Sequence, residues 1–209
     1  MSFFSSRRST VHGINGGVAT SQPLASQVGI DVLKAGGNAV DAAITMASTL
    51  GVVEPMSTGI GGDIFALIWD PKSEKISSFN GSGTSSRNSN PEELISKGFS
   101  SIPTEGEGGA YSVSVPGSVD GWQKILDKFG TISLSESLQP GIKLAEEGYP
   151  VSELISWAWS ENESKLKFRK SGSELLNKNN KAPKEGEIIR LPELASSMYT
   201  ISKEGPKAI

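Results

Sequence analysis

The chain has 209 residues, enough for one large domain or two small ones, and its formal net charge of −3 gives no sign of binding to nucleic acid. It contains no cysteine, which excludes disulfides, a thiol nucleophile and a cysteine-based metal site. The sequence has neither the apolar run of about 7–15 residues that a secretory signal needs nor a stretch of about 18 apolar residues. We therefore expect a globular protein that is located in the cytoplasm and contacts no membrane.

Two helices are expected early in the chain, at residues 21–35 and 38–53. Ser21 can cap the first helix with its side chain. Asn38 can cap the second helix, and Asp41 can reach back to the backbone of Asn38, as in a capping box. The second helix is nearly all small or apolar, and its few polar residues form one narrow stripe. We expect this helix to be mostly buried.

A glycine-rich turn is expected where the second helix ends. Pro55 cannot continue a helix, and it biases Glu54 away from the helical conformation. The turn that follows comprises Gly59, Ile60, Gly61, Gly62 and Asp63. We interpret its glycines as positions where side chains would clash, so that replacing Gly61 with valine should lower the folded yield. The alternative interpretation is that the turn lines a substrate pocket.

A β-hairpin should follow this turn, because the apolar run at 64–69 ends at Asp70-Pro71 and a second short strand is expected at 75–79. The alternation at 111–115 is typical of a half-buried strand. The other expected elements are a short strand at 18–20 and helices at 91–95, 118–129, 134–147, 151–159 and 191–202. The charged residues 160–187 are expected to form a mobile excursion.

The residues alone indicate no active site. The single histidine, His12, lies in a polar N-terminal segment without signs of a catalytic triad. The turn at 59–63 precedes a strand instead of opening a helix, so both nucleotide-binding fingerprints are excluded. The carboxylate pairs Glu92-Glu93 and Glu146-Glu147 are typical of solvated helix faces. We therefore expect no metal and no cofactor.

Several blocks of the sequence nevertheless resemble a known family. They are Gly17-Val18-Ala19-Thr20-Ser21, the run from Gly36 to Ala43, the run from Val52 to Asp63, the run from Ser114 to Val119, and the run from Leu138 to Gly148. In this order they resemble the large-subunit motifs of the gamma-glutamyltransferase (gamma-glutamyltranspeptidase) family. The start, with Ser6-Arg7-Arg8-Ser9, is similar to the soluble branch of that family.

The resemblance implies a mixed α+β fold, an N-terminal nucleophile hydrolase of αββα layers with helices outside two stacked sheets. Residues 1–209 would be a single incomplete domain, the N-terminal part of the large subunit. A precursor of this family cleaves itself and frees a threonine at the start of a small subunit, whose own α-amine acts as base. The substrate would be a small γ-glutamyl compound such as glutathione, and the partner would be that small subunit. Two alternatives remain: an inactive relative that acts as a binding module, and a β-lactam (cephalosporin) acylase of the same fold.

The sequence departs from the family pattern in two ways. No Thr-Thr-His-like nucleophile motif occurs, so the chain expressed alone should be catalytically silent, and it should aggregate through the uncovered strand at 64–69. The family also has an arginine-alanine-proline run in the loop after the second strand, where this chain has Thr84-Ser85-Ser86. Arg87, three residues after Thr84, could pair with the substrate α-carboxylate or could be an ordinary exposed arginine.

Overall fold

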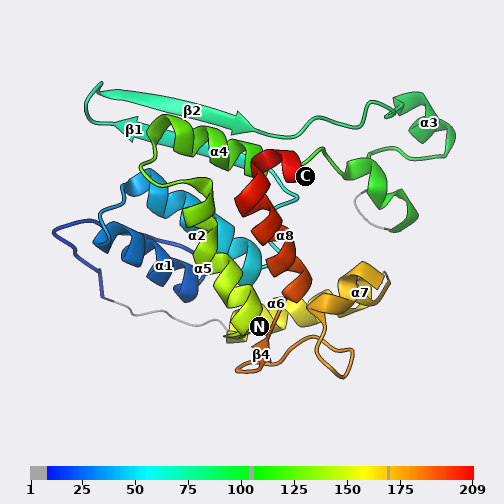
Figure 1. Cartoon of the computed structure of the whole chain (residues 1–209). Coiled ribbons are helices and arrows are strands. Elements are labelled where there is room, and N and C mark those ends of the chain that lie inside the picture. The colour runs from blue at the N-terminus through cyan, green and yellow to red at the C-terminus, as the bar shows by residue number, and fades with distance from the viewer. Residues whose placement is uncertain (1–8, 104–105, 169) are drawn as a thin grey trace.

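The computed structural model describes residues 9–103, 106–168 and 170–209 and is mainly helical (Figure 1). Four helices contact one another in succession: α1 (Pro23–Lys34), α2 (Ala39–Val53), α5 (Leu134–Glu147) and α8 (Pro192–Glu204). A hairpin packs against a further helix; these elements are β1 (Ile64–Asp70), β2 (Lys75–Gly81) and α4 (Ser118–Phe129). The helices and the hairpin predicted in this part of the chain are confirmed. No helix in the described ranges is both long and apolar enough to cross a membrane.

The sequence predicts the N-cap of α2 correctly but not that of α1. Asn38 caps α2 as expected: its side chain accepts from the backbone of Val40 and Asp41, and the Asp41 carboxylate accepts from the Asn38 N–H. Ser21 does not cap α1. Gln22 occupies that position, and the Ser21 hydroxyl instead donates to the Glu54 carboxylate. A glutamate 33 residues away therefore takes the hydroxyl that was expected to serve the local helix.

Helix α2 buries its polar stripe. The side chains of Thr45, Ser48 and Thr49 are almost completely inaccessible to solvent. Thr45 donates to the Asp41 carbonyl and Thr49 donates to the Thr45 carbonyl, so each hydroxyl is satisfied within its own helix. Ser48 donates to the Thr45 carbonyl and also to the Ser137 carbonyl of α5, which joins the two helices. Small hydroxyl residues therefore allow close helix packing without leaving a polar group unpaired.

The hairpin has one covered face and one exposed face. Its antiparallel register pairs Ile64 with Gly81 and Asp70 with Lys75. Because side chains alternate along a strand, Ile64, Ala66 and Ile68 pack against the core together with Phe79. The other face carries large apolar side chains with high exposed fractions: Phe65 68%, Leu67 79%, Trp69 57% and Ile76 67%. We call these four residues the outer face of the hairpin.

The later part of the chain is helical with two short strands. Its elements are α3 (Pro91–Ser96), the 3₁₀ helix η1 (Gly106–Ser112), β3 (Tyr149–Pro150), α6 (Glu153–Glu161), α7 (Glu163–Phe168), the 3₁₀ helix η2 (Lys170–Leu175), β4 (Ile188–Ile189) and the 3₁₀ helix η3 (Gly205–Ala208). Strands β3 and β4 pair antiparallel. Within residues 160–187, expected to be mobile, the Glu163 carboxylate accepts from the Ala182 N–H, and Leu176 is buried.

Two predicted strands are wrong. Residues 18–20 form no strand, and the segment 111–115 ends a 3₁₀ helix and continues as irregular backbone. Val113 and Val115 are exposed, so the alternating pattern there does not reflect a buried face. Alternation indicates a strand only where another strand offers an edge for pairing, and here the backbone of Val115 bonds a loop residue, Thr84.

The core lies between α2, α4, α5, α6 and α8. It contains two tryptophans, Trp122 of α4 and Trp159 of α6, which are 3% and 2% exposed. Tyr149 is also buried, and its hydroxyl donates to the Val52 carbonyl at the C-terminal end of α2 (2.8 Å). This bond satisfies one of the carbonyls that the last turn of a helix leaves unpaired. Burial without a nearby charge raises the pKa of Tyr149, so this donor stays protonated.

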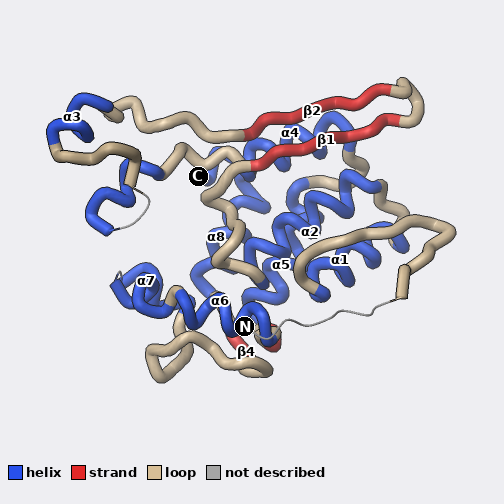
Figure 2. Tube along the Cα trace, turned by 180° about the vertical axis from the view of Figure 1, so that it is seen from behind, coloured by secondary structure: helices blue, strands red, loops and turns tan. Residues whose placement is uncertain are grey.

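Between β2 and α4 the chain leaves the body of the protein and returns (Figure 2). We call residues 82–103 and 106–117 the α3 excursion. None of the residues of α3 is buried. The side-chain contacts of α3 are with other residues of the excursion. Lys97 pairs with Glu93 and donates to the Tyr111 hydroxyl (2.6 Å), which links α3 to η1. The excursion is therefore held to the body mainly at its two ends.

Candidate functional site

The family-like motif at the end of α2 forms the connection to β1. Glu54 is the C-cap of α2, and its backbone N–H donates to the Leu50 carbonyl (2.8 Å). Its carboxylate accepts from the Ser21 hydroxyl, which ties the start of α1 to this connection. Pro55 then ends the helical hydrogen bonding, as the sequence indicates. Glu54 and Pro55 therefore have structural roles that the geometry accounts for.

The turn at residues 59–63 lies against the N-terminus of α4. The Gly62 carbonyl accepts hydrogen bonds from the backbone N–H groups of Gly117 (3.0 Å) and Ser118 (2.9 Å). The Ser118 hydroxyl donates to the Ile60 carbonyl (2.9 Å). Two of the N–H groups that a helix start leaves without internal partners are thus satisfied by a turn about 55 residues earlier in the chain.

Asp63 joins this turn to both ends of the α3 excursion. Its Oδ1 accepts the Gly83 N–H (2.8 Å) and, at longer distance, the Ser114 hydroxyl (3.4 Å). Next to these contacts, the Val115 N–H donates to the Thr84 carbonyl (2.9 Å). We call residues 81–84 and 114–117 the stem of the excursion. Three segments far apart in the sequence meet at this point.

The glycines that permit this meeting are not the ones that the sequence suggested. An added Cβ at Gly59 or Gly61 would meet no atom within 4 Å, and neither residue has a positive φ, so the expected clash at Gly61 is wrong. The tight positions lie in the stem. A Cβ at Gly83 would lie 1.7 Å from the Val115 carbonyl oxygen, and one at Gly117 would lie 2.2 Å from that of Gly81. Close backbone approach therefore requires glycine at these two positions.

A matched pair of substitutions tests this assignment. Gly117→Ala should lower the free energy of unfolding by about 1–3 kcal/mol, because the new methyl group meets backbone atoms that cannot rotate away. Its φ of −113° suits alanine, so the cost comes from the clash alone. Gly61→Ala should change stability by less than about 0.5 kcal/mol. Urea unfolding of both variants measures the difference, and an equal loss in both would contradict the assignment.

Asn38 and Asp41 lie at the N-terminal end of α2, a helix of 15 residues that is about 22 Å long, whereas the turn follows its C-terminal end. The Asn38 side-chain amide donates to the Phe129 carbonyl (2.7 Å). Asp41 is fully buried and accepts from the N–H groups of Thr131 (2.7 Å) and Ile132 (3.2 Å) and from the Thr131 hydroxyl (2.6 Å). These two residues fix the start of α2 to the α4–α5 connection and do not belong to the turn.

The electrostatics of Asp41 agree with this structural role. Burial raises the pKa of Asp41, but hydrogen bonds from the Thr131 hydroxyl and from the N–H groups of Asn38, Thr131 and Ile132 together outweigh burial. The net result is a pKa below the ordinary value of 3.8. A carboxylate that is held ionised by donors on all sides is a weak base, which makes it unsuited to proton transfer near neutral pH.

Arg87 lies in the first part of the α3 excursion, four residues after Gly83, and its side chain is exposed. In the described part of the chain it forms no ion pair with a carboxylate. His12 is also exposed. The structure therefore brings the turn, Gly83, Ser114 and Ser118 together, and it leaves Arg87 near them in sequence but without contact. Ser114, Gly117 and Ser118 belong to a family-like block of the sequence. No local pattern, however, indicated that they would contact the turn at 59–63.

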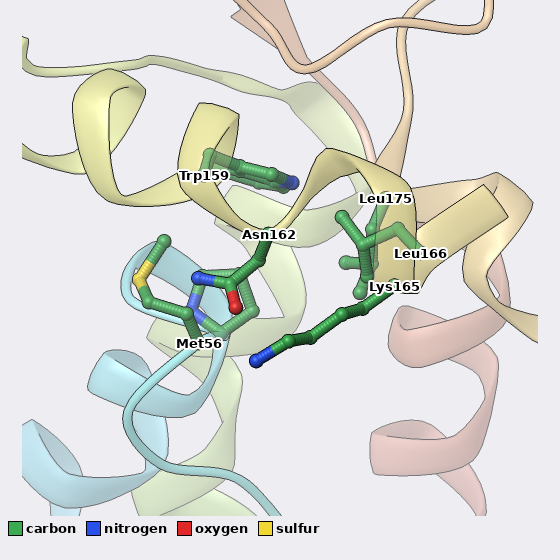
Figure 3. A pocket seen from close by; sticks show the side chains of 7 residues that line it. Met56, Trp159, Asn162, Lys165, Leu166 and Leu175 are labelled. Carbon is green, nitrogen blue, oxygen red and sulfur yellow. The ribbon is translucent and has the colours of Figure 1, made fainter. Parts of the chain in front are cut away.

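Pockets and metal-binding groups add little to this picture. Among the described residues no cluster of three or more His, Asp or Glu side chains could hold a metal ion. A pocket beside Pro55 and Met56 has a volume of about 210 Å³, below the range typical of ligand sites (Figure 3). Its walls are mainly apolar, from Met56, Trp159, Leu166 and Leu175, and Lys165 runs along its rim. Larger hollows of about 540–650 Å³ lie beside the start of α2, beside the start of α1 and beside β4, and none of these three is lined by the turn or the stem. The stem and the turn remain the candidate site because two family-like blocks, 52–63 and 114–119, meet there.

Comparison with known proteins identifies the family. The family model described as gamma-glutamyltranspeptidase matches residues 25–209, nearly the whole chain. The chain belongs to the gamma-glutamyltranspeptidase family. The resemblance that the sequence blocks indicated is therefore confirmed, and the match runs from within α1 to the end of the chain.

Individual family members agree with this assignment. The glutathione hydrolase proenzyme of Bacillus subtilis (strain 168) is 36% identical over 197 residues, which are 94% of this chain and 33% of that protein. The crystal structure of Helicobacter pylori gamma-glutamyltranspeptidase has a TM-score of 0.88 at 30% identity and covers 96% of this chain and 57% of its own. A cephalosporin acylase structure from Bacillus halodurans has a TM-score of 0.85 at 38% identity, covering 96% of this chain and 38% of its own.

These matches also decide the fold class and the extent of the chain. The predicted α+β fold of the N-terminal part of a large subunit is confirmed, since helices and short antiparallel strands superpose on family structures over almost the whole chain. The chain spans about a third of the length of the curated relative that it matches. Its relatives are enzymes, and several of them are named as proenzymes, which implies that these relatives are made as precursors that are cleaved.

Proposed function

We propose that these 209 residues are the large-subunit part of a cytoplasmic enzyme that hydrolyses or transfers γ-glutamyl groups. The nucleophile would be the N-terminal threonine of a small subunit cut from the same precursor, and it lies outside this chain. The observation that carries the proposal is the TM-score of 0.88 to a gamma-glutamyltranspeptidase over 96% of the chain. The similarity to a protein named glutathione hydrolase proenzyme supports glutathione as one substrate.

The chain would contribute substrate recognition rather than bond cleavage. A γ-glutamyl compound carries a free α-carboxylate, and a guanidinium group can bind a carboxylate through two parallel hydrogen bonds. Arg87 is exposed, and in the described residues no carboxylate competes for it. We therefore assign Arg87 to the substrate α-carboxylate. The oxyanion that forms when the threonine attacks would need backbone N–H donors, which a small subunit can supply.

The test of the proposed function is an assay of the full-length protein. Expression from the complete reading frame should give two fragments through self-cleavage at a threonine. The purified protein should then release 4-nitroaniline from γ-glutamyl 4-nitroanilide. Alanine in place of that threonine is the control, and it should abolish both cleavage and release. A protein that neither cleaves itself nor releases the chromophore would instead be an inactive relative that acts as a binding module.

A second candidate function is supported by one specific observation. The cephalosporin acylase structure has the higher identity of the two solved structures described above, 38% against 30%. An acylase would use the same fold and nucleophile on a different amide. The ratio of kcat/KM for γ-glutamyl 4-nitroanilide and for a cephalosporin that carries an acyl side chain separates the two functions. A ratio above one favours the γ-glutamyl substrate, and a ratio below one favours the acylase.

Removing the guanidinium group should weaken substrate binding. In the full-length enzyme, Arg87→Ala should raise KM for γ-glutamyl 4-nitroanilide about tenfold or more, which is the usual effect of losing a hydrogen bond to a charged group. Arg87→Lys should restore only part of the loss, because an ammonium group cannot form the bidentate pair. Arg190→Ala, at another exposed arginine, is the matched control. An unchanged KM in Arg87→Ala would show that Arg87 is an ordinary exposed arginine.

A further inference from the structure

We infer that Asp63 is a positioning residue, whose carboxylate holds the stem of the α3 excursion and thereby fixes the place of Arg87. This inference rests on the proposed function of Arg87 at the substrate carboxylate. It goes beyond that proposal, because it assigns to a residue of the glycine-rich turn a role in substrate recognition without contact to the substrate.

The first observation is that the excursion is attached to the body only weakly except at its stem. No residue of α3 is buried, and the links from Lys97 to Glu93 and to Tyr111 lie inside the excursion. The backbone of the excursion extends away from the packed helices (Figures 1 and 2). Such links make the excursion stiff, but they do not place it relative to α2 and α4. Its position must therefore be set where residues 81–84 and 114–117 contact the body.

The second observation is that Asp63 contacts both halves of the stem. Its Oδ1 accepts from the Gly83 N–H at 2.8 Å on the outgoing side and from the Ser114 hydroxyl at 3.4 Å on the returning side. The turn that carries Asp63 is itself fixed, because the Gly62 carbonyl accepts two N–H groups from the start of α4. The carboxylate thus connects the stem to the part of the molecule that is anchored by helix packing.

The third observation is the short path from this bond to Arg87. Three residues lie between Gly83 and Arg87, and the carbonyl of the first of them, Thr84, is held by the Val115 N–H (2.9 Å). A shift at Gly83 is therefore passed on over one or two further residues. Binding a carboxylate bidentately requires the guanidinium group to be placed within a fraction of an ångström, and displacements of about 1 Å away from the chemistry can cost about a hundredfold in rate.

The experiment compares Asp63→Ala and Asp63→Asn in the full-length enzyme. Asp63→Ala removes the acceptor for Gly83, and we expect KM for γ-glutamyl 4-nitroanilide to rise about tenfold while kcat stays within about twofold. Asp63→Asn retains a side-chain oxygen that can accept the Gly83 N–H, so it should restore most of the affinity. With 4-aminobutyryl 4-nitroanilide, which lacks the α-carboxylate, the variants should differ little from the unsubstituted enzyme.

Asp70→Ala is a matched control. Asp70 lies at the other end of β1, and like Asp63 it accepts a backbone N–H, that of Lys72 (3.0 Å), and a serine hydroxyl, that of Ser73 (2.8 Å). It contacts the hairpin turn and not the stem. Its replacement should leave KM unchanged. A rise in KM in Asp70→Ala would show that the loss of any surface aspartate affects the enzyme.

Hydrogen exchange measures the positioning directly and does not depend on activity. In Asp63→Ala the amide of Gly83 should exchange at least tenfold faster, while amides of α2 keep their rates. Unchanged exchange at Gly83 together with an unchanged KM would overturn the inference. An equal rise in KM in Asp63→Ala and Asp63→Asn would also overturn the inference. It would show that the negative charge of Asp63, and not its hydrogen bond to Gly83, affects substrate binding. Faster exchange at Gly83, with no effect of Arg87→Ala on KM, would leave Asp63 as the residue that holds the stem and refute the assignment of Arg87.

Discussion

Replacing Asp41 with alanine is expected to lower the free energy of unfolding by about 3 kcal/mol or more, among the largest single-residue effects in this chain. The substitution removes the acceptor of three backbone N–H groups, those of Asn38, Thr131 and Ile132, and of the Thr131 hydroxyl. Each donor that loses a buried partner costs about 1–3 kcal/mol unless water reaches it. The cavity left by the carboxylate adds to the loss.

Asp41→Asn should be less damaging but not neutral. An amide keeps one oxygen for the N–H groups of Thr131 and Ile132, but it presents an NH₂ group to the Asn38 N–H, where the carboxylate presents an acceptor. Asp120→Ala is the control, because Asp120 is exposed and forms only a surface ion pair with Lys124, which contributes little. Urea unfolding at low protein concentration measures all three variants, and a loss in Asp41→Ala no larger than in Asp120→Ala would contradict the expectation.

The same carboxylate gives stability a dependence on pH with a definite sign. The pKa of Asp41 in the folded state lies below its ordinary value of 3.8, because donated hydrogen bonds favour the ionised form more than burial disfavours it. A lowered folded pKa means that the contribution of Asp41 is complete above the unfolded pKa and is lost as the pH falls through the folded one. The difference in stability between the unsubstituted chain and Asp41→Ala should therefore be constant near pH 7 and shrink below about pH 4.

The second large effect concerns activity: the 209-residue chain expressed by itself should release no chromophore from γ-glutamyl 4-nitroanilide. Acyl transfer requires a nucleophile and a base within hydrogen-bond reach of each other. In the described residues the buried hydroxyls of Thr45 and Thr49 donate to helix carbonyls. The hydroxyl of Thr131, an exposed residue, donates to Asp41, whose lowered pKa makes it a poor base. The single histidine, His12, is exposed.

The isolated chain should also associate with itself. The outer face of the hairpin exposes Phe65, Leu67, Trp69 and Ile76 on adjacent strands, and both strand edges are free of β-partners in the described part of the chain. Size-exclusion chromatography and the anilide assay should give oligomers without turnover, with the full-length protein measured alongside under the same conditions. A monodisperse chain that hydrolyses the anilide would overturn both expectations.

Local signals were sufficient for the elements that are built from neighbours in sequence. The capping box of Asn38 and Asp41, the break at Pro55 and the hairpin around Asp70-Pro71 each depend on residues a few positions apart, and each was predicted correctly. The polar stripe of α2 was read from the sequence, but its complete burial depends on α5, about 90 residues later.

The stem could not be predicted, because it too depends on contacts between segments that are far apart in the sequence. Gly83 and Val115 approach each other from positions 32 residues apart, and Asp63 lies 20 residues before its partner Gly83. A pattern of spacing within one segment carries no information on which distant backbone will come close. The wrong strand at 111–115 follows from treating a segment with a long-range contact as a local preference. The clash expected at Gly61 was inferred from the local turn, whereas the close backbone approaches lie at Gly83 and Gly117.

The placement of the tryptophans gives the protein an optical signal that separates its interior from its surface. Trp122 and Trp159 are enclosed by the core, while Trp69 and Trp157 are 57% and 52% exposed. Indole fluorescence shifts to shorter wavelength when water is excluded, so the native emission is the sum of a blue and a red component. Covering the hairpin by any other polypeptide would move the Trp69 component toward the blue and leave the core pair unchanged. Association of this chain with a partner polypeptide that covers the hairpin could thus be followed in real time without a label.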